Sequence, residues 1–395
     1  MIKIALLGFG TVGKGTYEIL NKNRENIKKI VSDDVVVTKI LKRNLNFETD
    51  LDKKLFTDNF EDIINDEEIL LIVEMTGDLE NSYMYIKRAI ENKKNVVTAN
   101  KAVVSEYFEE FTELAKKNNV AFLYESSVAA SLPIITPLKS QSVINDIYRV
   151  RGILNGTSNF LLSNMELENK DYSDVLKQAQ NLGYAEAEPF DDVEGIDALR
   201  KLRILSTIAF KSPIKNENIL HYGIGSISKV DIEYFKNNNL RVKLVAESKL
   251  DDKGYTSIVE PVILSRDDSL FNINDTNNIV EIFGDNYDSL SVAGQGAGSF
   301  QTGNAVVIDI IDALCKNYID LEFNRDLKNM SENMEGIYYL RISNKFSIDD
   351  SLIDNLNNIG ENIVIKTKKI KRNILFEQLK NIPKKEYFVG RYEID

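Results

Sequence analysis

The sequence contains one histidine, one cysteine and no tryptophan among its 395 residues, and each scarcity excludes a class of site. A metal centre built on several histidines is excluded because His221 stands alone. His221 falls in an apolar, strand-like stretch without a nearby carboxylate, so we expect it to be a packed structural residue. Cys315 has no partner for an internal disulfide, which favours a reducing compartment.

Long apolar runs and an excess of basic charge are also missing. No apolar run reaches the roughly 18–20 residues of a membrane span, and the opening MIKIALL leads into a glycine loop rather than a small-residue cleavage site. The net charge of −12 repels phosphate backbones and anionic lipid surfaces. We therefore expect a cytoplasmic protein that has neither nucleic acid nor membrane as a partner.

The first third of the chain alternates short apolar runs with helical patterns. This alternation predicts an α/β domain in which helices cover a doubly wound parallel sheet. The expected strands are 2–7, 35–41, 69–75, 95–98 and 119–124, and the expected helices are 11–22, 60–66, 79–93 and 104–118.

The rest of the chain predicts two further domains, since one core seldom serves so long a chain. The middle predicts an α+β domain with strands at 148–154, 241–247 and 257–264, helices near 158–168 and 172–182, and a long helix after Asp191. The tail predicts strand, helix, strand, helix and strand, with its first helix at 349–360. We expect the domains to be 1–134 plus about 296–320, then 135–295, then 334–395.

The stretch GFGTVG places Gly8, Gly10 and Gly13 between the first strand and the first helix. Gly8 permits a tight turn, Gly10 lets a pyrophosphate approach the backbone, and Gly13 allows the helix to pack closely on the sheet. The helix N-terminus then faces the phosphates. The pattern predicts a Rossmann-type dinucleotide site.

The second strand ends in Lys42 and Arg43, with no carboxylate before Glu48. A basic group at this point suits the 2′-phosphate of NADP(H), whereas an acid would suit the ribose of NAD(H). We expect NADP(H) to be preferred and NAD(H) to remain an alternative. Exposed basic residues at a strand end are the competing explanation.

Lys101 follows the fourth predicted strand, in VVTANKA. It therefore lies at the carboxyl edge of the sheet, where open α/β folds bind ligands, and can meet a nicotinamide or a substrate. The alternative is a solvated strand-end lysine.

An acidic stretch, GYAEAEPFDDVEGIDALRKL, covers residues 183–202. The spacing of Asp191 and Glu194 predicts a capping box at the start of the long helix. Asp197 and Lys201 are four residues apart and share a helix face, next to an apolar stripe.

These acids allow two interpretations. A surface ion pair between Asp197 and Lys201 would contribute only a few tenths of a kcal/mol. The functional interpretation is that Glu186, Asp192 and Asp197 surround a cationic substrate and Lys201.

Seven motifs resemble homoserine dehydrogenases, in the order of that family, over roughly residues 1–320. The resemblance implies NAD(P)H-dependent reduction of L-aspartate 4-semialdehyde to L-homoserine, on the branch to threonine and methionine. The motifs are GFGTVG, VEMTG, TANKA, YESSV, GILNGTSNF, the acidic stretch, and GAG at 296–298.

The resemblance also implies roles for single residues. It makes Lys201 the catalytic lysine and Lys101 a second lysine that meets cofactor and substrate. The implied cofactor residues are Gly8, Phe9, Gly10, Thr11, Val12, Gly13, Thr76, Thr98, Lys101, Gly183 and Gly298, to which Arg43 is added from the strand-end argument. The implied substrate residues are Glu186, Asp197, Asp192, Gly156 and Thr157.

Three further features follow from the resemblance. A monovalent cation such as sodium is implied at Glu125, Val128, Ala130 and Leu132, although VAASLP stands where the family has glycines. A homodimer or higher homo-oligomer is implied. The tail resembles a short ACT domain without the loop glycine after its first strand, so a ferredoxin-like unit that serves dimer contact is the alternative to an effector site.

Two competing functions stay open at this point. A dinucleotide-sensing regulator on the same fold needs the glycines but not the two lysines with Glu186 and Asp197. Another NAD(P)-dependent amino-acid dehydrogenase would lack the combination of NGT and the acidic stretch.

Overall fold

The computed structural model describes residues 1–296 and 298–393, which form two compact units. The first unit comprises Met1–Asn145, Thr207–Pro213 and Gly294–Asn324, and the second comprises Asp146–Ser206, Ile214–Ala293 and Arg325–Asp395. Residues 135–145 thus lie with the first unit, and the tail lies with the middle of the chain. In the described part of the chain, no helix has both the length and the hydropathy of a membrane span.

The first unit is built on a parallel sheet of six strands in the order β3-β2-β1-β4-β5-β6. This sheet confirms the predicted α/β fold. The strand order reverses between β1 and β4, and such a reversal opens a ligand crevice at the carboxyl ends of the strands. The strands are β1 (Ile2–Leu7), β2 (Val35–Leu41), β3 (Phe56–Thr57), β4 (Ile69–Glu74), β5 (Asn95–Thr98) and β6 (Phe122–Leu123).

Helices accompany this sheet, and four of them, at residues 24–31, 126–129, 135–144 and 299–315, were not predicted from the sequence. Helix α2 (Arg24–Val31) follows α1 (Thr11–Lys22) directly, and α13 (Ser299–Cys315) comes from a distant part of the chain. The others are α3 (Glu61–Ile64), α4 (Leu79–Glu91), α5 (Lys101–Asn118), α6 (Ser126–Ala129) and α7 (Ile135–Ile144).

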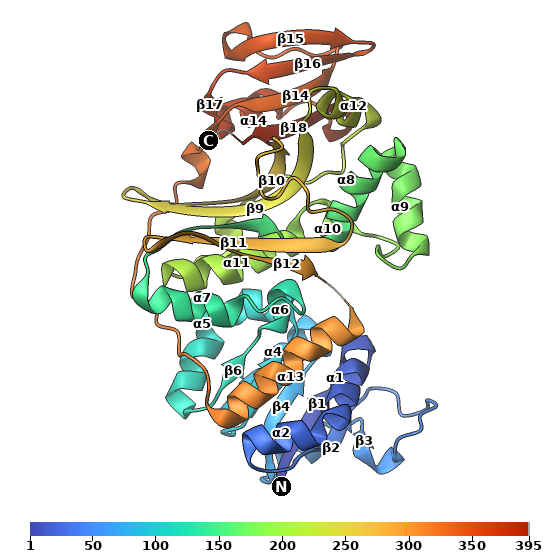
Figure 1. Ribbon diagram of the computed structural model, residues 1–395, viewed down its shortest axis with the longest axis vertical. Helices are drawn as coiled ribbons and strands as arrows, with labels where there is room; N and C mark the ends of the chain where they lie inside the picture. The colour runs from blue at the N-terminus through green and yellow to red at the C-terminus, as the bar shows by residue number, and fades with distance from the viewer. Residues whose placement is uncertain (297, 394–395) are drawn as a thin grey trace. The chain divides into compact units, whose positions relative to one another are not determined.

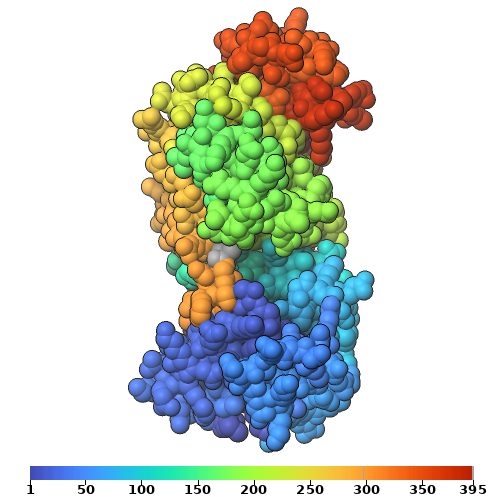
Figure 2. Space-filling model, turned by 90° about the vertical axis from the view of Figure 1, so that its right-hand side faces the viewer, coloured from blue at the N-terminus to red at the C-terminus, as the bar shows by residue number. Residues whose placement is uncertain are grey.

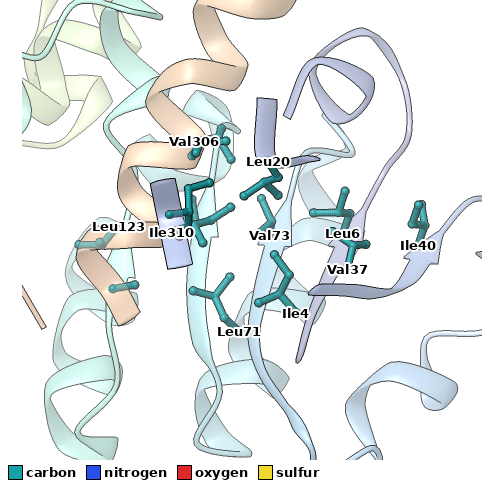
Figure 3. Packing of buried hydrophobic residues seen from close by; sticks show 14 of the residues in the cluster. Ile4, Leu6, Leu20, Val37, Ile40, Leu71, Val73, Leu123, Val306 and Ile310 are labelled. Atoms are coloured by element: carbon teal, nitrogen blue, oxygen red, sulfur yellow. The ribbon is translucent and has the colours of Figure 1, made fainter. Parts of the chain in front are cut away.

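The core of the first unit lies between the sheet and α13. Figure 3 shows Val306 and Ile310 of α13 beside Val73 and Leu71 of β4, and all four are completely buried. Burial on both faces of the sheet explains why β1 and β4 read as nearly continuous apolar runs.

Close helix packing attaches α13 to α1 (Figure 1). A Cβ atom at Gly15 would lie 2.6 Å from the carbonyl oxygen of Ser299, and one at Gly303 would lie 2.9 Å from the backbone nitrogen of Thr16. Both positions therefore require glycine, and the two helices cross with their backbones almost in contact.

The second unit is built on a mixed sheet of ten strands, in which β8 pairs with β10 outside the order β12-β11-β7-β9-β10-β18-β14-β16-β15. The sequence did not predict β11 and β12, which form a hairpin around Asp285 and Asn286. The strands from the middle of the chain are β7 (Ile147–Ile153), β8 (Leu220–His221), β9 (Arg241–Asp251), β10 (Gly254–Leu264), β11 (Asn277–Gly284) and β12 (Tyr287–Gln295).

Five helices accompany this sheet, and they correct two predictions. The long helix begins at Ile196 rather than after Asp191, because Gly195 with φ +82° separates it from a short helix. The predicted capping box is wrong: Asp191 lies inside that short helix and pairs with Arg200 at 2.5 Å. The helices are α8 (Gly156–Glu168), α9 (Tyr172–Asn181), α10 (Phe190–Val193), α11 (Ile196–Phe210) and α12 (Lys229–Asn237).

The expectation of a packed His221 is also wrong. This residue ends the two-residue strand β8, and its side chain is exposed.

The tail contains β14 (Tyr338–Ser343), β15 (Ile353–Ile359), β16 (Asn362–Thr367), α14 (Arg372–Leu379) and β18 (Tyr387–Tyr392), with the short pair β13 (Glu335–Gly336) and β17 (Ile370–Lys371). The helix predicted at 349–360 is wrong, because this segment forms β15. The apolar residues Leu352, Leu356 and Ile359 fit a helical period. A two-residue loop with Gly360 at φ +58° instead folds the segment back onto β16.

A buried charge network attaches the tail to the middle of the chain. Arg391 of β18 contacts Glu260 at 2.7 Å, Glu247 at 3.0 Å and Glu393 at 2.8 Å. Burial alone would raise the pKa of Glu247, but Arg391, Lys249 and Arg149 together lower it to about 2. Arg391 also takes part in the parallel pairing of β18 with β10, where it lies opposite Val262.

We predict that Arg391→Met destabilises the protein by about 3–5 kcal/mol at pH 7, because it leaves buried carboxylates uncompensated. The stability that Glu247 contributes is present above its ordinary pKa of 4.5 and is lost as the pH falls toward 2. Urea denaturation should therefore show a smaller difference between variant and parent at pH 3 than at pH 7. Lys369→Met, at an exposed pair, is the control and should change little. An equal loss at both pH values would contradict the prediction.

Candidate functional site

The glycine loop after β1 has the conformation that the sequence predicts. Gly8 has φ +96°, and a Cβ atom there would lie 2.8 Å from the carbonyl oxygen of Met75. A Cβ atom at Gly13 would lie 2.4 Å from the carbonyl oxygen of Gly8, whereas one at Gly10 meets no heavy atom within 4 Å. Helix α1 begins at Thr11, and no side chain caps the backbone N–H groups of its first turn. An open space beside uncapped backbone N–H groups fits a pyrophosphate.

The start of α13 lies at the same place. Ser299 Oγ donates to the carbonyl oxygen of Thr11 at 2.6 Å, and Gly298 precedes it with φ +134°. The N-terminal ends of α1 and α13 are therefore neighbours in the first unit. Of the predicted GAG motif, Ala297 lies outside the described residues.

The basic end of β2 has an acidic neighbour that the sequence reasoning missed. Arg43 Nη2 lies 2.9 Å from a carboxylate oxygen of Asp78, which also caps α4. Lys42 Nζ lies 4.7 Å from the centre of the Phe47 ring. Asp78 follows β4 and Arg43 follows β2, and these two strands lie on either side of β1. The contact between Asp78 and Arg43 could therefore be predicted only from the strand order.

Thr76 and Thr98, the predicted cofactor threonines, share one buried partner. Both hydroxyl groups donate to the carboxylate of Glu74 at 2.7 Å. Thr98 is completely buried and Thr76 is partly exposed. Asn100 caps α5, so Lys101 is the first residue of that helix.

In the second unit, Lys201 forms a buried ion pair at the centre of the predicted catalytic cluster. Its Nζ lies 2.8 Å from Asp197 Oδ2 and donates to the carbonyl oxygen of Leu154 at 2.6 Å. The exposed fractions are 7% for Lys201 and 2% for Asp197, which excludes a solvated surface pair. The i,i+4 spacing on α11 brings the two side chains together.

Asn155 joins the two acids, and the sequence reasoning overlooked it. Its amide nitrogen donates to Asp192 Oδ1 at 2.6 Å and to Asp197 Oδ2 at 2.8 Å. Its carbonyl oxygen accepts from the backbone N–H of Ser158 at 2.7 Å and so caps α8. The available signal was an asparagine shortly before the helix expected near 158–168, since asparagine is a favoured N-cap residue.

The neighbouring loops keep the start of α8 in place. A Cβ atom at Gly156 would lie 2.9 Å from the carbonyl oxygen of Thr276. Thr157 Oγ1 donates to the carbonyl oxygen of Tyr184 at 2.8 Å. Gly183, with φ +77°, ends α9 just before that residue.

Glu186 lies apart from the buried acids. Its side chain is exposed, and its backbone carbonyl accepts from Gln180 at 3.1 Å. Among the residues with described structure, no hydrogen bond joins its carboxylate to Asp192 or Asp197. Figure 2 shows the green surface of α8 and α9 and the segment that follows them on one face of the second unit.

The predicted residues are thus divided between the units. The first unit carries the glycine loop, Arg43, Thr76, Thr98, Lys101 and Gly298. The second carries Gly156, Thr157, Gly183, Glu186, Asp192, Asp197 and Lys201.

The predicted cation segment forms the turn between β6 and α7. The Glu125 carboxylate accepts from the backbone N–H groups of Ile134 and Ile135, each at 2.6 Å, and of Thr136 at 2.8 Å. Ala130 has φ +50°, a conformation that favours glycine. No group of three or more His, Cys, Asp and Glu residues within 1–296 and 298–393 is arranged to hold a metal ion.

Two family profiles match most of the chain. The family profile described as homoserine dehydrogenase, NAD binding domain, matches residues 8–125. The profile described as homoserine dehydrogenase matches residues 133–311.

Individual relatives cover most of the chain. A homoserine dehydrogenase from Synechocystis sp. is 38% identical over 317 residues, which is 79% of this chain and 73% of the relative. The crystal structure of a homoserine dehydrogenase from Thiobacillus denitrificans has a TM-score of 0.90 at 32% identity and covers 99% of this chain and 98% of that one. A hyperthermophilic archaeal homoserine dehydrogenase mutant, in complex with NADPH, has a TM-score of 0.68 at 27% identity and covers 81% of this chain and 99% of that one.

We predict that Lys201→Met lowers the free energy of unfolding by about 3–5 kcal/mol, because Asp197 then keeps a buried charge without its ammonium. The double variant Lys201→Met, Asp197→Leu should recover most of this loss, since no charge is left. Urea denaturation of both variants measures the difference. The control is Arg200→Met, which removes the more exposed pair with Asp191 and should cost about 0–1 kcal/mol. A double variant that is less stable than Lys201→Met would contradict the prediction.

Proposed function

The chain belongs to the homoserine dehydrogenase family and is an NAD(P)-dependent oxidoreductase of amino-acid biosynthesis, and from this premise we propose which residues carry out its reaction. The observation that carries the proposal is the buried group of Lys201, Asp197 and Asn155, to which the partly buried Asp192 is hydrogen-bonded. The reaction is the reversible reduction of L-aspartate 4-semialdehyde to L-homoserine. It needs one hydride at the aldehyde carbon and one proton at its oxygen.

Lys201 is the proposed proton donor. A bound reduced nicotinamide supplies the hydride, and negative charge then develops on the substrate oxygen. The ammonium of Lys201 stabilises this charge and gives one proton to the oxygen. Asp197, at 2.8 Å, keeps the ammonium charged before the transfer, and the carbonyl oxygen of Leu154 at 2.6 Å fixes its direction.

The acidic residues are proposed to bind the positively charged end of the substrate. Glu186 is proposed to accept from the substrate ammonium, because its exposed carboxylate has no hydrogen-bond partner in the part of the chain that the structure describes. Asp192 adds negative charge next to Asn155, and Gly156 with Thr157 borders the substrate space. Lys101 is proposed to contact cofactor and substrate.

The cofactor residues are proposed on the fit of the glycine loop. Gly8 to Gly13, Thr76 and Gly298 would hold the dinucleotide in the first unit, with Thr98 supporting from its buried position. Gly183 is proposed for the second unit. NADP(H) is the proposed preference, supported by Arg43 and Lys42 and by the NADPH complex of the archaeal relative.

The cation site fits less well. Both carboxylate oxygens of Glu125 already accept from backbone N–H groups, so a sodium ion would be held mainly by the carbonyls of Val128, Ala130 and Leu132. No step of the proposed mechanism depends on such an ion.

Assembly and the tail complete the proposal. The sheet of the second unit ends in two exposed edge strands, β12 and β15, which could pair with another copy, and we propose a homodimer. The tail is proposed to be structural rather than regulatory, because its last strand belongs to the central sheet of the unit and it lacks the expected loop glycine.

We predict that Lys201→Ala lowers kcat by at least about 100-fold while the dissociation constant of NADPH changes less than twofold, since the lysine acts on the reacting oxygen. Glu186→Gln should instead raise the KM for homoserine by roughly 10–100-fold, because it weakens a charge-assisted hydrogen bond. Steady-state kinetics and fluorescence titration separate the two effects. A Lys201→Ala enzyme with a tenth or more of the parent rate would show that another group donates the proton.

We also predict the basis of cofactor choice. Arg43→Ala should reduce the preference for NADPH over NADH about tenfold or more, because a guanidinium can make two parallel hydrogen bonds to the 2′-phosphate. Asp78→Asn is the informative companion: it removes the carboxylate that competes for Arg43 and should strengthen NADPH binding. The measurements are dissociation constants and kcat/KM for both cofactors. A parent enzyme that binds NADH as tightly as NADPH would rule the idea out.

A further inference from the structure

We propose that Glu74 is a positioning residue for the cofactor: its buried carboxylate orders the loop after β4 and the turn after β5, and it leaves the Thr76 hydroxyl able only to accept a hydrogen bond. This inference rests on the proposed function, which places a dinucleotide at these loops.

Glu74 stands at the point where three segments of the first unit meet. It is the last residue of β4, and its side chain is completely buried. Its Oε1 accepts from the backbone N–H and the hydroxyl of Thr76, both at 2.7 Å, and from the hydroxyl of Ser82 at 2.8 Å. Its Oε2 accepts from the hydroxyl of Thr98 at 2.7 Å. The carboxylate therefore joins the end of β4, the start of α4 and the end of β5.

Neutral donors alone hold this carboxylate. Within residues 1–296 and 298–393 no lysine or arginine forms an ion pair with Glu74. A buried carboxylate is expensive unless its oxygens are satisfied, and here hydroxyl and N–H groups satisfy them. An apolar residue here would leave these donors without an acceptor, so the carboxylate fixes the groups around it as well as filling space.

The direction of the hydrogen bonds follows from counting protons. Asn100 Nδ2 donates to Ser82 Oγ at 3.0 Å, and Ser82 Oγ donates to Glu74 at 2.8 Å. The backbone N–H of Asn100 donates to Thr98 Oγ1 at 3.0 Å, and the Thr98 proton also goes to Glu74. Because a carboxylate can only accept, none of these bonds can reverse.

Thr76 inherits the same restriction. Its hydroxyl proton points to Glu74, with Ser82 Oγ 2.9 Å away as the only other neighbour among the described residues, so its partly exposed oxygen presents lone pairs outward. Such an oxygen recognises an N–H or O–H donor of the cofactor, such as a carboxamide or a ribose hydroxyl. It does not suit a phosphate oxygen, which would need the proton that Thr76 donates to Glu74.

The network also reaches Lys101. Asn100 receives its position from Thr98 and Ser82, and its side-chain oxygen accepts from the N–H groups of Ala102 and Val103 at 3.1 and 3.3 Å. The first turn of α5, which carries Lys101, is thereby fixed relative to Glu74.

The experiment compares two buried polar residues at opposite edges of one sheet. Glu74→Gln keeps the size of the side chain but gives it an N–H₂ group that faces donors. The matched control is Lys94→Met: Lys94 is 5% exposed and donates to the carbonyl oxygens of Asp66 and Ile69 at 2.6 and 2.8 Å, next to the amino end of β4. Both variants are made in the full chain, and their Tm, NADPH dissociation constant, kcat and KM for homoserine are measured.

We expect Glu74→Gln to raise the NADPH dissociation constant and lower kcat, each about tenfold or more. Lys94→Met should lower the Tm to a similar extent and change neither constant more than twofold. Thr76→Val should weaken NADPH binding in the parent but have little further effect in Glu74→Gln, because the oriented hydroxyl is already lost.

Two results would overturn the inference. One is a Glu74→Gln enzyme that loses Tm but keeps both constants, which would make Glu74 structural like Lys94. The other is full additivity of Glu74→Gln and Thr76→Val, which would separate the two residues. NADPH binding needs no turnover, so a parent that binds NADPH without oxidising homoserine would refute the proposed function alone.

Discussion

The second unit is organised around one electrostatic constraint, the burial of the Lys201 ammonium. Removing an ammonium and a carboxylate from water costs several kcal/mol for each ion unless both are paired and hydrogen-bonded. The pair with Asp197 meets part of this cost, the Leu154 carbonyl and the Asn155 amide meet more, and these groups come from three elements. The end of β7, the start of α8 and the first turns of α11 must therefore converge on one point. Gly156 allows this convergence, because any side chain there would collide with the backbone of Thr276.

The first unit satisfies a buried carboxylate by a different means. Asp197 has a cation beside it, whereas Glu74 has hydroxyl and amide donors. An ion pair keeps an ammonium group protonated inside the protein, and an ammonium group can lose and regain a proton. A carboxylate among neutral donors instead fixes the orientation of the hydroxyl and N–H groups around it, because each of them points its proton at the carboxylate. The two arrangements suit the roles that we propose for them, a proton transfer at Lys201 and the positioning of the cofactor by Glu74.

Local patterns were enough to predict much of the fold and part of the site. The glycines of GFGTVG, the strands of the parallel sheet and the i,i+4 pair of Asp197 and Lys201 depend on neighbours in sequence, and the structure has all three. The same local reasoning produced the wrong helix at 349–360, where the apolar residues fit a helical period but pairing with β16 decides. It also produced the wrong capping box, because Gly195 begins a new helix that the spacing of acids does not reveal.

Contacts between distant segments could not be predicted in this way. Asp78 reaches Arg43 only because β2 and β4 flank β1 in the sheet. Asn155 joins Asp192 and Asp197 across a gap of about forty residues, and its place shortly before a helix indicates a cap but not this contact. The hairpin of β11 and β12 was missed because its sequence lacks a strong alternation of apolar and polar residues. It forms by pairing at the edge of the sheet. Pair energies across the fold, rather than local propensity, decide these features.

The parallel pairing of β10 with β18 has a consequence for the order in which the protein is made. A ribosome synthesises Glu247 and Glu260 well before it reaches Arg391, which lies more than a hundred residues further along the chain. During that interval, the central sheet lacks a strand and its carboxylates lack the guanidinium that later neutralises them. The second unit cannot reach its final structure while the chain is still growing, whereas most of the parallel sheet of the first unit is available early. Pairing of β10 with β18 is therefore a late step in the formation of the second unit.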